Sequence, residues 1–258
     1  MQLQELLYSQ GFGTRRVCAG LVQQGLVKIG LPESAETLVQ CTDSAQQVEP
    51  EEGWRFQVQG VDWEYHARAY VMLHKPAGTE CSQKPSTYPS IYSLLPPPLR
   101  QRPVKSAVQG VQAVGRLDQD TTGLLLLSDD GQFIHRMGSP KRHVPKVYQI
   151  TAKHEVTEAQ VQQLLAGVVL DDDPKAVRAA ACERVGSHGL HLTLTEGKYH
   201  QVKRMLAAVG NRVEALHRSR VGALELDPAL LAPGKWRWLN ADDLQKLQPV
   251  DKPGVQST

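Results

Sequence analysis

The stretch "AVGRLDQDTTGLLLLSDDG", Ala113–Gly131, places an arginine and two carboxylates directly before a run of four leucines. An apolar run of this length, with Gly123 before it and Asp-Asp-Gly after it, is typical of a short buried strand that ends in a turn. Arg116, Asp118 and Asp120 are therefore predicted in a polar loop at the start of a buried strand. Loops of this kind often carry catalytic residues and are equally often ordinary turns, so position alone does not decide between the two.

Composition places the chain among ordinary globular proteins. It has 258 residues, 41% of them hydrophobic, which is enough for one large domain or two unequal ones. No apolar run approaches the roughly 18 residues of a membrane span, and the first residues lack the basic and apolar parts of a signal peptide. We therefore expect a cytoplasmic protein without membrane contact. The four cysteines contain no Cys-x-x-Cys pair, so neither a zinc site nor a disulfide framework is predicted.

The charged residues are unevenly distributed. The net charge of +2 indicates no particular partner, but basic residues gather at 15–16, 136–146 and 198–220, whereas acidic residues gather at 49–52 and 171–173. This segregation favours a positive face that binds a polyanion. For any single cluster, a solvated surface remains the ordinary alternative.

The first part of the chain predicts a small helix-helix-strand unit. Leu3–Gln10 forms a short helix that Gly11 ends, Thr14 caps a second helix to about Gln24, and "LVKI" follows as a strand. The second helix opens with two arginines, where the helix dipole disfavours cations unless an anion lies close by. This placement indicates phosphate binding. A boundary to a larger α+β body is predicted near residues 60–68.

Two further segments of the body carry chemistry-bearing side chains. In "PKVYQI", Pro145–Ile150, a strand period of two puts Tyr148 on the same face as Lys146 and Ile150, where a core role is the ordinary alternative.

The other segment, "TEGKYHQVKRMLAAVGNRV", predicts a turn followed by a helix. The buried stripe of this helix has the spacing i, i+3, i+4, i+7 and consists of Val202, Met205, Leu206 and Val209. Lys203 and Arg204 lie beside that stripe near the helix start, where they call for a carboxylate or phosphate partner.

Taken together, "GRLDQDTTGLLLLSDDG", "KVYQI" and "EGKYHQVKRMLAAVG" resemble the pseudouridine synthases of ribosomal RNA, specifically the RsuA type that acts on small-subunit rRNA. The resemblance runs from Tyr70 to about Leu247 in the family's order. "LHKPAG", Leu73–Gly78, is similar to the family's opening strand and turn, with His74 where the family has Asn. The N-terminal stretch "GTRRVCAGLVQQGLVKI" is similar to an S-four-like RNA-binding module, although its first helix lacks the usual early basic residue.

The resemblance implies a fold and a domain plan. The fold is α+β, the pseudouridine-synthase fold with a mixed, mainly antiparallel sheet and flanking helices, plus a small N-terminal α/β RNA-binding domain. The implied plan is an RNA-binding domain at 1–60, a linker at 61–69, a catalytic domain at 70–248 and a polar tail at 249–258. The protein is expected to be a monomer whose partner is ribosomal RNA.

The resemblance also implies a catalytic set. Asp118 is the nucleophile, Tyr148 packs against the flipped uracil and takes a proton from ring carbon five, and Lys203 pairs with Asp118. Asp120 has no catalytic role in the motif and is expected to shape the turn together with a neighbouring threonine. Neither a metal nor a cofactor is implied.

Other basic residues are implied to hold the RNA. Arg116 occupies the space that the flipped uridine vacates, because a stacked base must be extruded before it can react. Arg204 meets phosphate, and the N-terminal module binds RNA through Arg15, Arg16 and Lys28.

Three alternatives remain at this level. "DQDTT" also satisfies the Asp-x-Asp-x-Thr pattern of haloacid-dehalogenase-type phosphotransferases, in which the first Asp attacks phosphorus and the second works with Mg²⁺. A non-catalytic RNA-binding protein could keep the same fold. Within the family, the enzyme could act on large-subunit (23S) rather than small-subunit (16S) rRNA.

Overall fold

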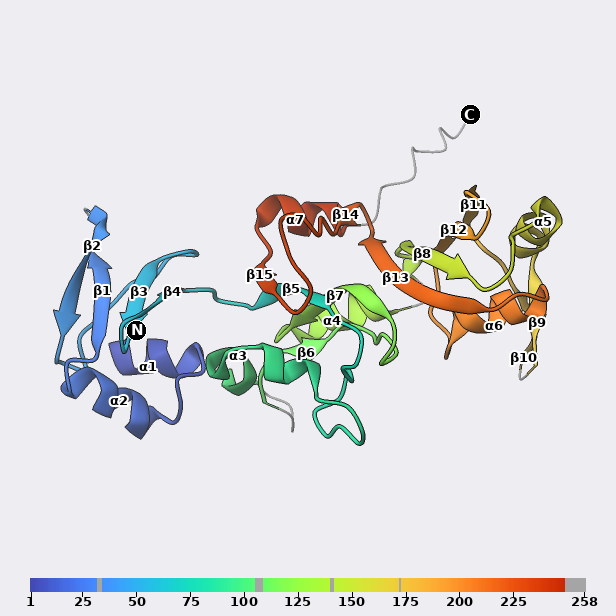
Figure 1. Ribbon diagram of the computed structural model, residues 1–258. Coiled ribbons are helices and arrows are strands. Elements are labelled where there is room, and N and C mark those ends of the chain that lie inside the picture. The colour runs from blue at the N-terminus through green and yellow to red at the C-terminus, as the bar shows by residue number, and fades with distance from the viewer. Residues whose placement is uncertain (32–33, 105–108, 140–141, 172, 249–258) are drawn as a thin grey trace, which may run out of the picture. The chain divides into compact units, whose positions relative to one another are not determined.

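A computed structural model describes residues 1–31, 34–104, 109–139, 142–171 and 173–248, so the predicted polar tail at 249–258 lies outside the described residues. The chain divides into two compact units (Figure 1). Unit 1 comprises Met1–Tyr70, Leu95–Gln112 and Leu127–Gly131, and unit 2 comprises the remainder. The functional division at residues 60 and 70 stays a prediction.

Unit 1 contains a small sheet, two helices near the start of the chain and a third helix, α3, from a later segment. The first two helices were expected, and the second of them begins where Thr14 accepts a hydrogen bond from the Val17 amide at 3.3 Å. The sheet has the strand order β2-β1-β3-β4 with antiparallel pairing. The elements are α1 Leu3–Ser9, α2 Arg15–Gln23, β1 Val27–Leu31, β2 Ser34–Cys41, β3 Arg55–Val58, β4 Val61–Glu64 and α3 Pro97–Gln101.

The core of unit 1 forms because the apolar stripes of both helices face the sheet. Leu3, Leu6 and Leu7 of α1 are fully buried, and they belong to one cluster with Val27 and Phe56 of the strands. Burying a side chain of this size contributes about 1.5–3 kcal/mol, so this cluster is the main stabilising element of the unit.

A buried ion pair joins the later segments of unit 1 to its first helix. The Arg102 guanidinium donates to Asp129 at 2.6 Å, to the Gln10 side chain at 2.9 Å and to the His66 carbonyl at 2.7 Å. A buried guanidinium is tolerated only when its donors are satisfied, so these contacts fix residues 102 and 129 within the unit.

Unit 2 is built on a nine-stranded sheet with the order β11-β12-β8-β13-β7-β5-β15, to which β14 and β6 are paired at the side. The β13–β7 pair is parallel, whereas β11–β12, β12–β8, β8–β13 and β5–β15 are antiparallel. This is the predicted α+β class with a mixed, mainly antiparallel sheet. The strands are β5 Tyr70–Lys75, β6 Gln112–Ala113, β7 Thr122–Ser128, β8 Lys146–Ala152, β11 Ala181–Val185, β12 Gly189–Leu194, β13 Val213–Val221, β14 Leu224–Glu225 and β15 Trp236–Trp238.

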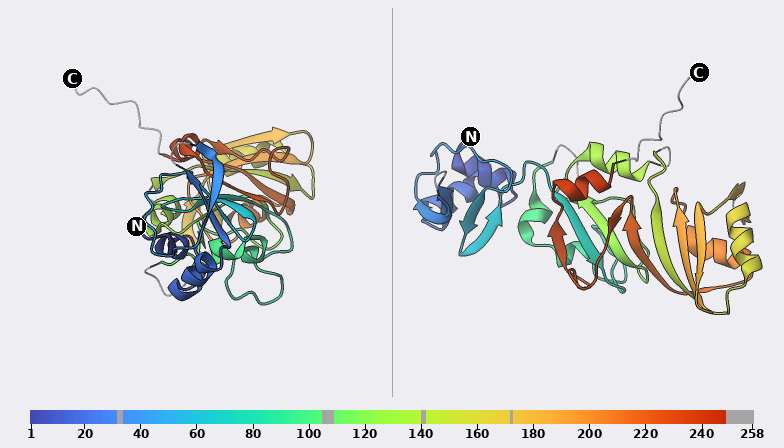
Figure 2. Two further views of the ribbon diagram at one scale, coloured as in Figure 1. Left: turned by 90° about the vertical axis from the view of Figure 1, so that its left-hand side faces the viewer. Right: turned by 90° about the horizontal axis from the view of Figure 1, so that it is seen from above.

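Helices and a separate two-stranded sheet accompany the large sheet. Figure 2 shows β13 as a long strand beside β8, in agreement with their extended register from Val213 to Val221. The remaining elements are η1 Ile91–Leu94, α4 Gly131–Gly138, α5 Glu158–Ala166, β9 Val168–Leu170, β10 Asp173–Val177, α6 Gln201–Ala208 and α7 Ala241–Lys246.

The leucine run forms the buried strand that its sequence predicts. In β7 every residue after Thr122 is buried, because the strand lies inside the sheet between β13 and β5. Because both faces of the strand are buried, its sequence is a continuous apolar run and does not alternate between apolar and polar residues. The polar loop before it is therefore attached to a buried central strand of the large sheet.

Gly123 is required where β7 begins beside β13. Its φ is +110°, and a Cβ at this position would overlap with the backbone carbonyl oxygen of Arg218 on β13. Gly123→Ala is expected to destabilise the protein by at least about 1–3 kcal/mol, since it combines backbone strain with a backbone clash. Urea unfolding measures the effect. The matched control is Gly138→Ala, whose Cβ would meet nothing within 4 Å; an equal loss in both variants would contradict the argument.

Candidate active site

The loop between β6 and β7 carries the predicted nucleophile. It turns at Gly115, where φ is +71°, and closes with a hydrogen bond of 3.1 Å from the Thr121 amide to the Asp118 carbonyl. The Gly78 amide, from the turn after β5, donates to the Gln119 carbonyl at 2.8 Å. The backbone around Asp118 is thus fixed by its own turn and by a neighbouring one.

Lys75, the last residue of β5, supports the same loop from inside. Its side chain is fully buried, and its Nζ donates to the carbonyl oxygens of Thr121 at 2.9 Å, Pro76 at 3.0 Å and Gln119 at 3.3 Å. Burial lowers the pKa of Lys75 from its ordinary value. The three carbonyl groups replace the water that the buried ammonium group has lost. The hydrogen bonds to Gln119 and Thr121 therefore hold the Asp118 loop against Lys75.

A single ammonium group joins both carboxylates of the loop. Lys203 Nζ, on α6, lies 3.0 Å from Asp118 Oδ2 and donates to the two oxygens of Asp120 at 2.7 and 2.9 Å. The family resemblance predicts the Asp118 contact. It assigns Asp120 only to the shape of the turn, whereas the structure makes Asp120 the closer partner of Lys203.

The electrostatics of this cluster follow from burial and pairing. Burial lowers the pKa of Lys203, but the hydrogen bonds that it donates to Asp120 and Asp118, and the charges of these carboxylates, outweigh burial and raise the pKa above 10.5. Burial raises the pKa of Asp120, but the hydrogen bond and charge of Lys203 outweigh it and bring the pKa below 3.8. Lys203 is therefore protonated and Asp120 ionised throughout the physiological range.

His200 is a further member of the cluster that sequence reasoning did not assign. Its Nε2 lies 3.3 Å from Asp118 Oδ1, on the oxygen that Lys203 does not contact. The residue precedes α6 and has left-handed backbone geometry, with φ of 47°. The quoted motif contained His200, but nothing in a helical periodicity predicts that the residue before the helix turns toward the loop.

Helix α6 delivers these side chains because its other face is anchored. Val202, Met205 and Leu206 are buried as the predicted stripe requires, and Val209 follows the helix end, also buried. Lys203 lies between two stripe positions, which leaves its side chain 28% exposed and directed at the loop carboxylates.

Tyr148 lies in the middle of the sheet. It is 8% exposed and lies across from Leu192 on β12 and Arg218 on β13. The burial alternation along β8 places it on the opposite face from Gln149 and Thr151. Within the described part of the chain, no hydrogen bond joins Tyr148 to Asp118.

Two cations share the Tyr148 side of the sheet. Arg218 is 3% exposed and donates through Nε to the Leu124 carbonyl at 2.8 Å. Burial, together with the charge of Arg218, lowers the pKa of Lys146 to about 8. Lys146 therefore titrates near the upper end of the physiological range.

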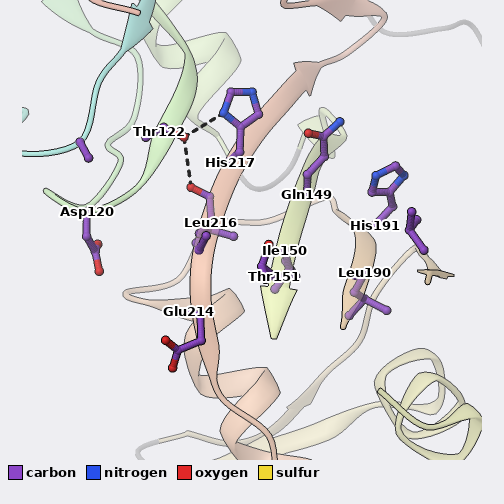
Figure 3. A pocket seen from close by; sticks show the side chains of 14 residues that line it. Asp120, Thr122, Gln149, Ile150, Thr151, Leu190, His191, Glu214, Leu216 and His217 are labelled. Atoms are coloured by element: carbon purple, nitrogen blue, oxygen red, sulfur yellow. Dashed lines mark hydrogen bonds between the residues drawn. The ribbon is translucent and has the colours of Figure 1, made fainter. Parts of the chain in front are cut away.

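A cavity of about 450 Å³ opens beside Asp120 (Figure 3). Thr122 and His217 connect it to the loop through a contact of 2.8 Å between Thr122 Oγ1 and His217 Nδ1. Burial and the neighbouring His74 lower the pKa of His217, so this ring is neutral at pH 7. The lining residues are Ala77, Asp120, Thr122, Gln149, Ile150, Thr151, Val185, Gly189, Leu190, His191, Glu214, Ala215, Leu216 and His217.

The residues expected to hold RNA differ in their surroundings. Arg116 is exposed beside Gly115, and Arg204 donates to the Tyr199 carbonyl at 3.1 Å. In unit 1, Arg16 and Lys28 are exposed.

Arg15 has a carboxylate partner inside the protein. Its guanidinium lies 2.7 Å from Glu5 and 4.1 Å from the centre of the Tyr8 ring. Glu5 supplies the anion that a cation in the first helical turn requires, so the position of Arg15 does not by itself indicate phosphate.

Metal-binding clusters and membrane-spanning helices are both missing from the described residues. These residues contain no group of three His, Cys, Asp or Glu side chains arranged to hold a metal ion. Within the same ranges, no helix is long and apolar enough to cross a membrane.

Comparison with known proteins relates this site to one family. Residues 69–208 match the family model described as RNA pseudouridylate synthase. A solved structure described as a pseudouridylate synthase is 32% identical, with a TM-score of 0.64 over 96% of this chain and 100% of that chain. This likeness covers both the motifs and the fold around them.

Curated relatives give the same result. The chain is 37% identical to an uncharacterized RNA pseudouridine synthase, YtzG, of Bacillus subtilis over 96% of this chain and 98% of the relative. It is 41% identical to ribosomal small subunit pseudouridine synthase A of Escherichia coli K12, over 69% of this chain and 74% of the relative, and of Pasteurella multocida, over 69% and 73%.

These matches exclude the phosphotransferase alternative. The dehalogenase-type pattern needs an apolar strand that ends at the first Asp. In the structure β6 ends at Ala113, and the backbone turns at Gly115 before it reaches Asp118.

The pairing of Asp120 predicts how stability depends on pH. Because the folded pKa of Asp120 is lowered, its contribution is fully present above its ordinary pKa and is lost as the pH falls through the lowered value. Asp120→Asn should therefore lower the free energy of unfolding by up to about 1 kcal/mol at pH 7 and by less at pH 3. Urea unfolding at both pH values measures the loss of unfolding free energy. Asp171→Asn, at an exposed position, is the control. A loss for Asp120→Asn that is larger at pH 3 than at pH 7 would contradict the lowered pKa of Asp120.

Proposed function

Because the chain belongs to the RNA pseudouridylate synthase family, we propose that it isomerises one specific uridine of small-subunit (16S) ribosomal RNA to pseudouridine. The relatives named for the small ribosomal subunit, at 41% identity, support the choice of RNA. The proposed enzyme acts in the cytoplasm during ribosome biogenesis. We propose that it works as a monomer.

The reaction is an isomerisation and needs no oxidant. The bond between the sugar carbon C1′ and uracil N1 breaks, the uracil rotates, and a bond forms between C1′ and ring carbon five. The proton lost from that carbon is balanced by one gained at N1. The protein must therefore supply a group that adds and leaves, a proton acceptor, and a site that excludes water from the detached base.

Asp118 is the proposed nucleophile, and the observation that carries this role is its contact with Lys203 at 3.0 Å. A carboxylate can form a covalent bond to the substrate and still leave. Lys203 Nζ lies against one oxygen of this carboxylate and orients it, while Lys75 holds the backbone that follows Asp118 through the Gln119 and Thr121 carbonyl oxygens.

The remaining roles concern the base. The target uridine must be extruded from its helix at a cost of a few kcal/mol, and Arg116, exposed on the same loop, fills the vacated space. Tyr148 packs against the uracil and accepts the proton from ring carbon five. Its position in the sheet interior supplies the water-excluding surface. Arg204 contacts phosphate.

Unit 1 is proposed to bind RNA through an S-four-like module. Arg16 and Lys28 are exposed there and available to phosphate, whereas Arg15 shares its charge with Glu5. Deleting residues 1–60 would also remove Gln10 from the buried Arg102, so charge reversal is the cleaner test of this role.

Asp118→Asn should abolish pseudouridine formation while RNA affinity stays close to wild type. An amide of the same shape is a very poor nucleophile, so the single-turnover rate should fall roughly a thousandfold or more. Asp171→Asn is the control and should react at the wild-type rate. Substantial product from a verified Asp118→Asn protein would remove Asp118 from the role, whereas absence of product from the wild-type protein would reopen the non-catalytic alternative.

The ribosomal RNA of a deletion strain should lack one pseudouridine, and it should lie in the small subunit. Double-stranded RNA hides its base edges, so the target is expected in a loop or an open segment of the assembling particle. Sequencing of chemically marked pseudouridines in both rRNAs identifies the site, and re-expression of the gene should restore it. Loss only from large-subunit (23S) rRNA would transfer the enzyme to that substrate.

Arg16→Glu combined with Lys28→Glu should weaken binding to a small-subunit rRNA transcript. The slope of log affinity against log salt should fall by about one for each phosphate that the variant no longer neutralises. Arg178→Glu with Arg184→Glu changes the net charge equally at exposed positions of unit 2 and is the matched control. An unchanged affinity and slope in the first variant would refute the RNA-binding role of unit 1.

A further inference from the structure

Tyr199 is the most exposed aromatic side chain among the described residues, with 76% of its surface accessible. Its ring stacks on the ring of His200, with 3.8 Å between the ring centres and 22° between the planes. A ring that packs only to bury apolar surface would be covered by its neighbours. This one is covered by the imidazole and otherwise remains open to solvent.

The stack is held in place on both sides. His200 has left-handed backbone geometry, which a non-glycine residue adopts at a cost of about 1–3 kcal/mol, and its Nε2 lies 3.3 Å from Asp118. The Tyr199 carbonyl accepts a hydrogen bond of 3.1 Å from Arg204. A strained residue that fixes an exposed aromatic ring beside the proposed nucleophile indicates that the ring contacts substrate.

We propose that Tyr199, stacked on His200, is a platform for the nucleobase of an unpaired nucleotide next to the target uridine. This inference rests on the proposed function. Extruding the uridine removes a stacking partner from the bases on both sides of it. Arg116 fills the vacated space, and an exposed aromatic ring offers a second stacking surface to a neighbouring base that has left the stack. The contact from His200 to Asp118 places the platform directly beside the reacting residue.

The chemistry of the platform is tolerant of sequence. Every nucleobase has an aromatic face, so the ring selects an unpaired nucleotide and not a particular base. The platform therefore contributes affinity and position to an open RNA segment, while the choice of uridine depends on other contacts.

The test combines side-chain changes with removal of a base. The probes are a ten-nucleotide single-stranded RNA with one uridine flanked by adenosines, and the same RNA lacking the base on the 5′ or the 3′ side of that uridine. The proteins are full-length wild type, Tyr199→Ala, Tyr199→Leu and Tyr199→Phe. Dissociation constants are measured for every pair, and thermal unfolding verifies that each variant is folded.

Tyr199→Ala should bind the intact RNA roughly 5- to 150-fold more weakly, which corresponds to the ordinary contribution of one base–aromatic stack. Tyr199→Leu keeps apolar bulk but no aromatic face and should show a similar loss, whereas Tyr199→Phe should bind like wild type. Removing one neighbouring base should weaken wild type comparably and leave Tyr199→Ala almost unaffected, because both changes remove the same contact.

Wild-type affinity in both Tyr199→Ala and Tyr199→Leu would overturn the platform. So would independent, additive losses from the protein change and the missing base. The proposed function is judged separately by mapping pseudouridine in rRNA. If the mapping found no lost pseudouridine in small-subunit rRNA, the assigned RNA would change, but the measured coupling between Tyr199 and the neighbouring base would still stand. If that coupling alone were absent, only the platform would be refuted.

Discussion

The hydrogen bonds from the buried Lys75 ammonium to the loop carbonyl oxygens are the constraint on which the site depends. A charged group at 0% exposure is costly unless its donors are satisfied, and here two of the three acceptors are backbone oxygens of the Asp118 loop. The loop therefore cannot move away from β5 without depriving the ammonium group of two acceptors. Because β5 and β7 are neighbours in the sheet, these hydrogen bonds tie the loop that carries Asp118, the proposed nucleophile, to the sheet.

The second cation of the site, Lys203, pairs unequally with its two carboxylates. Its contacts to Asp120, at 2.7 and 2.9 Å, are shorter than its contact of 3.0 Å to Asp118. Asp120 thus orients the ammonium group and accepts its shortest hydrogen bonds. Asp118 is left with one longer contact to the same group, through one of its two oxygens. The second oxygen of Asp118 faces His200 Nε2 at 3.3 Å, which is longer than the contact of the first oxygen with Lys203.

The sequence predicted those parts of the fold and the site that depend on local periodicity. The four leucines of β7, the alternation around Tyr148 and the stripe of α6 each reflect the burial of their own segment. Interactions between distant segments were not accessible in this way. Asp120 and Lys203 are 83 positions apart and belong to two different motifs, neither of which shows that the two side chains meet. Lys75 is likewise 46 positions from Thr121.

The same reasoning applies to unit 1, in which buried polar contacts join segments that are far apart in the sequence. Arg102 and Asp129 are separated from the first helix by long stretches of sequence, yet they join it because Gln10 and the His66 carbonyl complete the hydrogen bonding of the guanidinium. Composition indicates where a polar linker lies, but it carries no signal for a buried ion pair that recruits a later segment. A guanidinium at 2% exposure needs all of these partners at once, so the unit is defined by the contacts that satisfy one cation and not by a point along the chain.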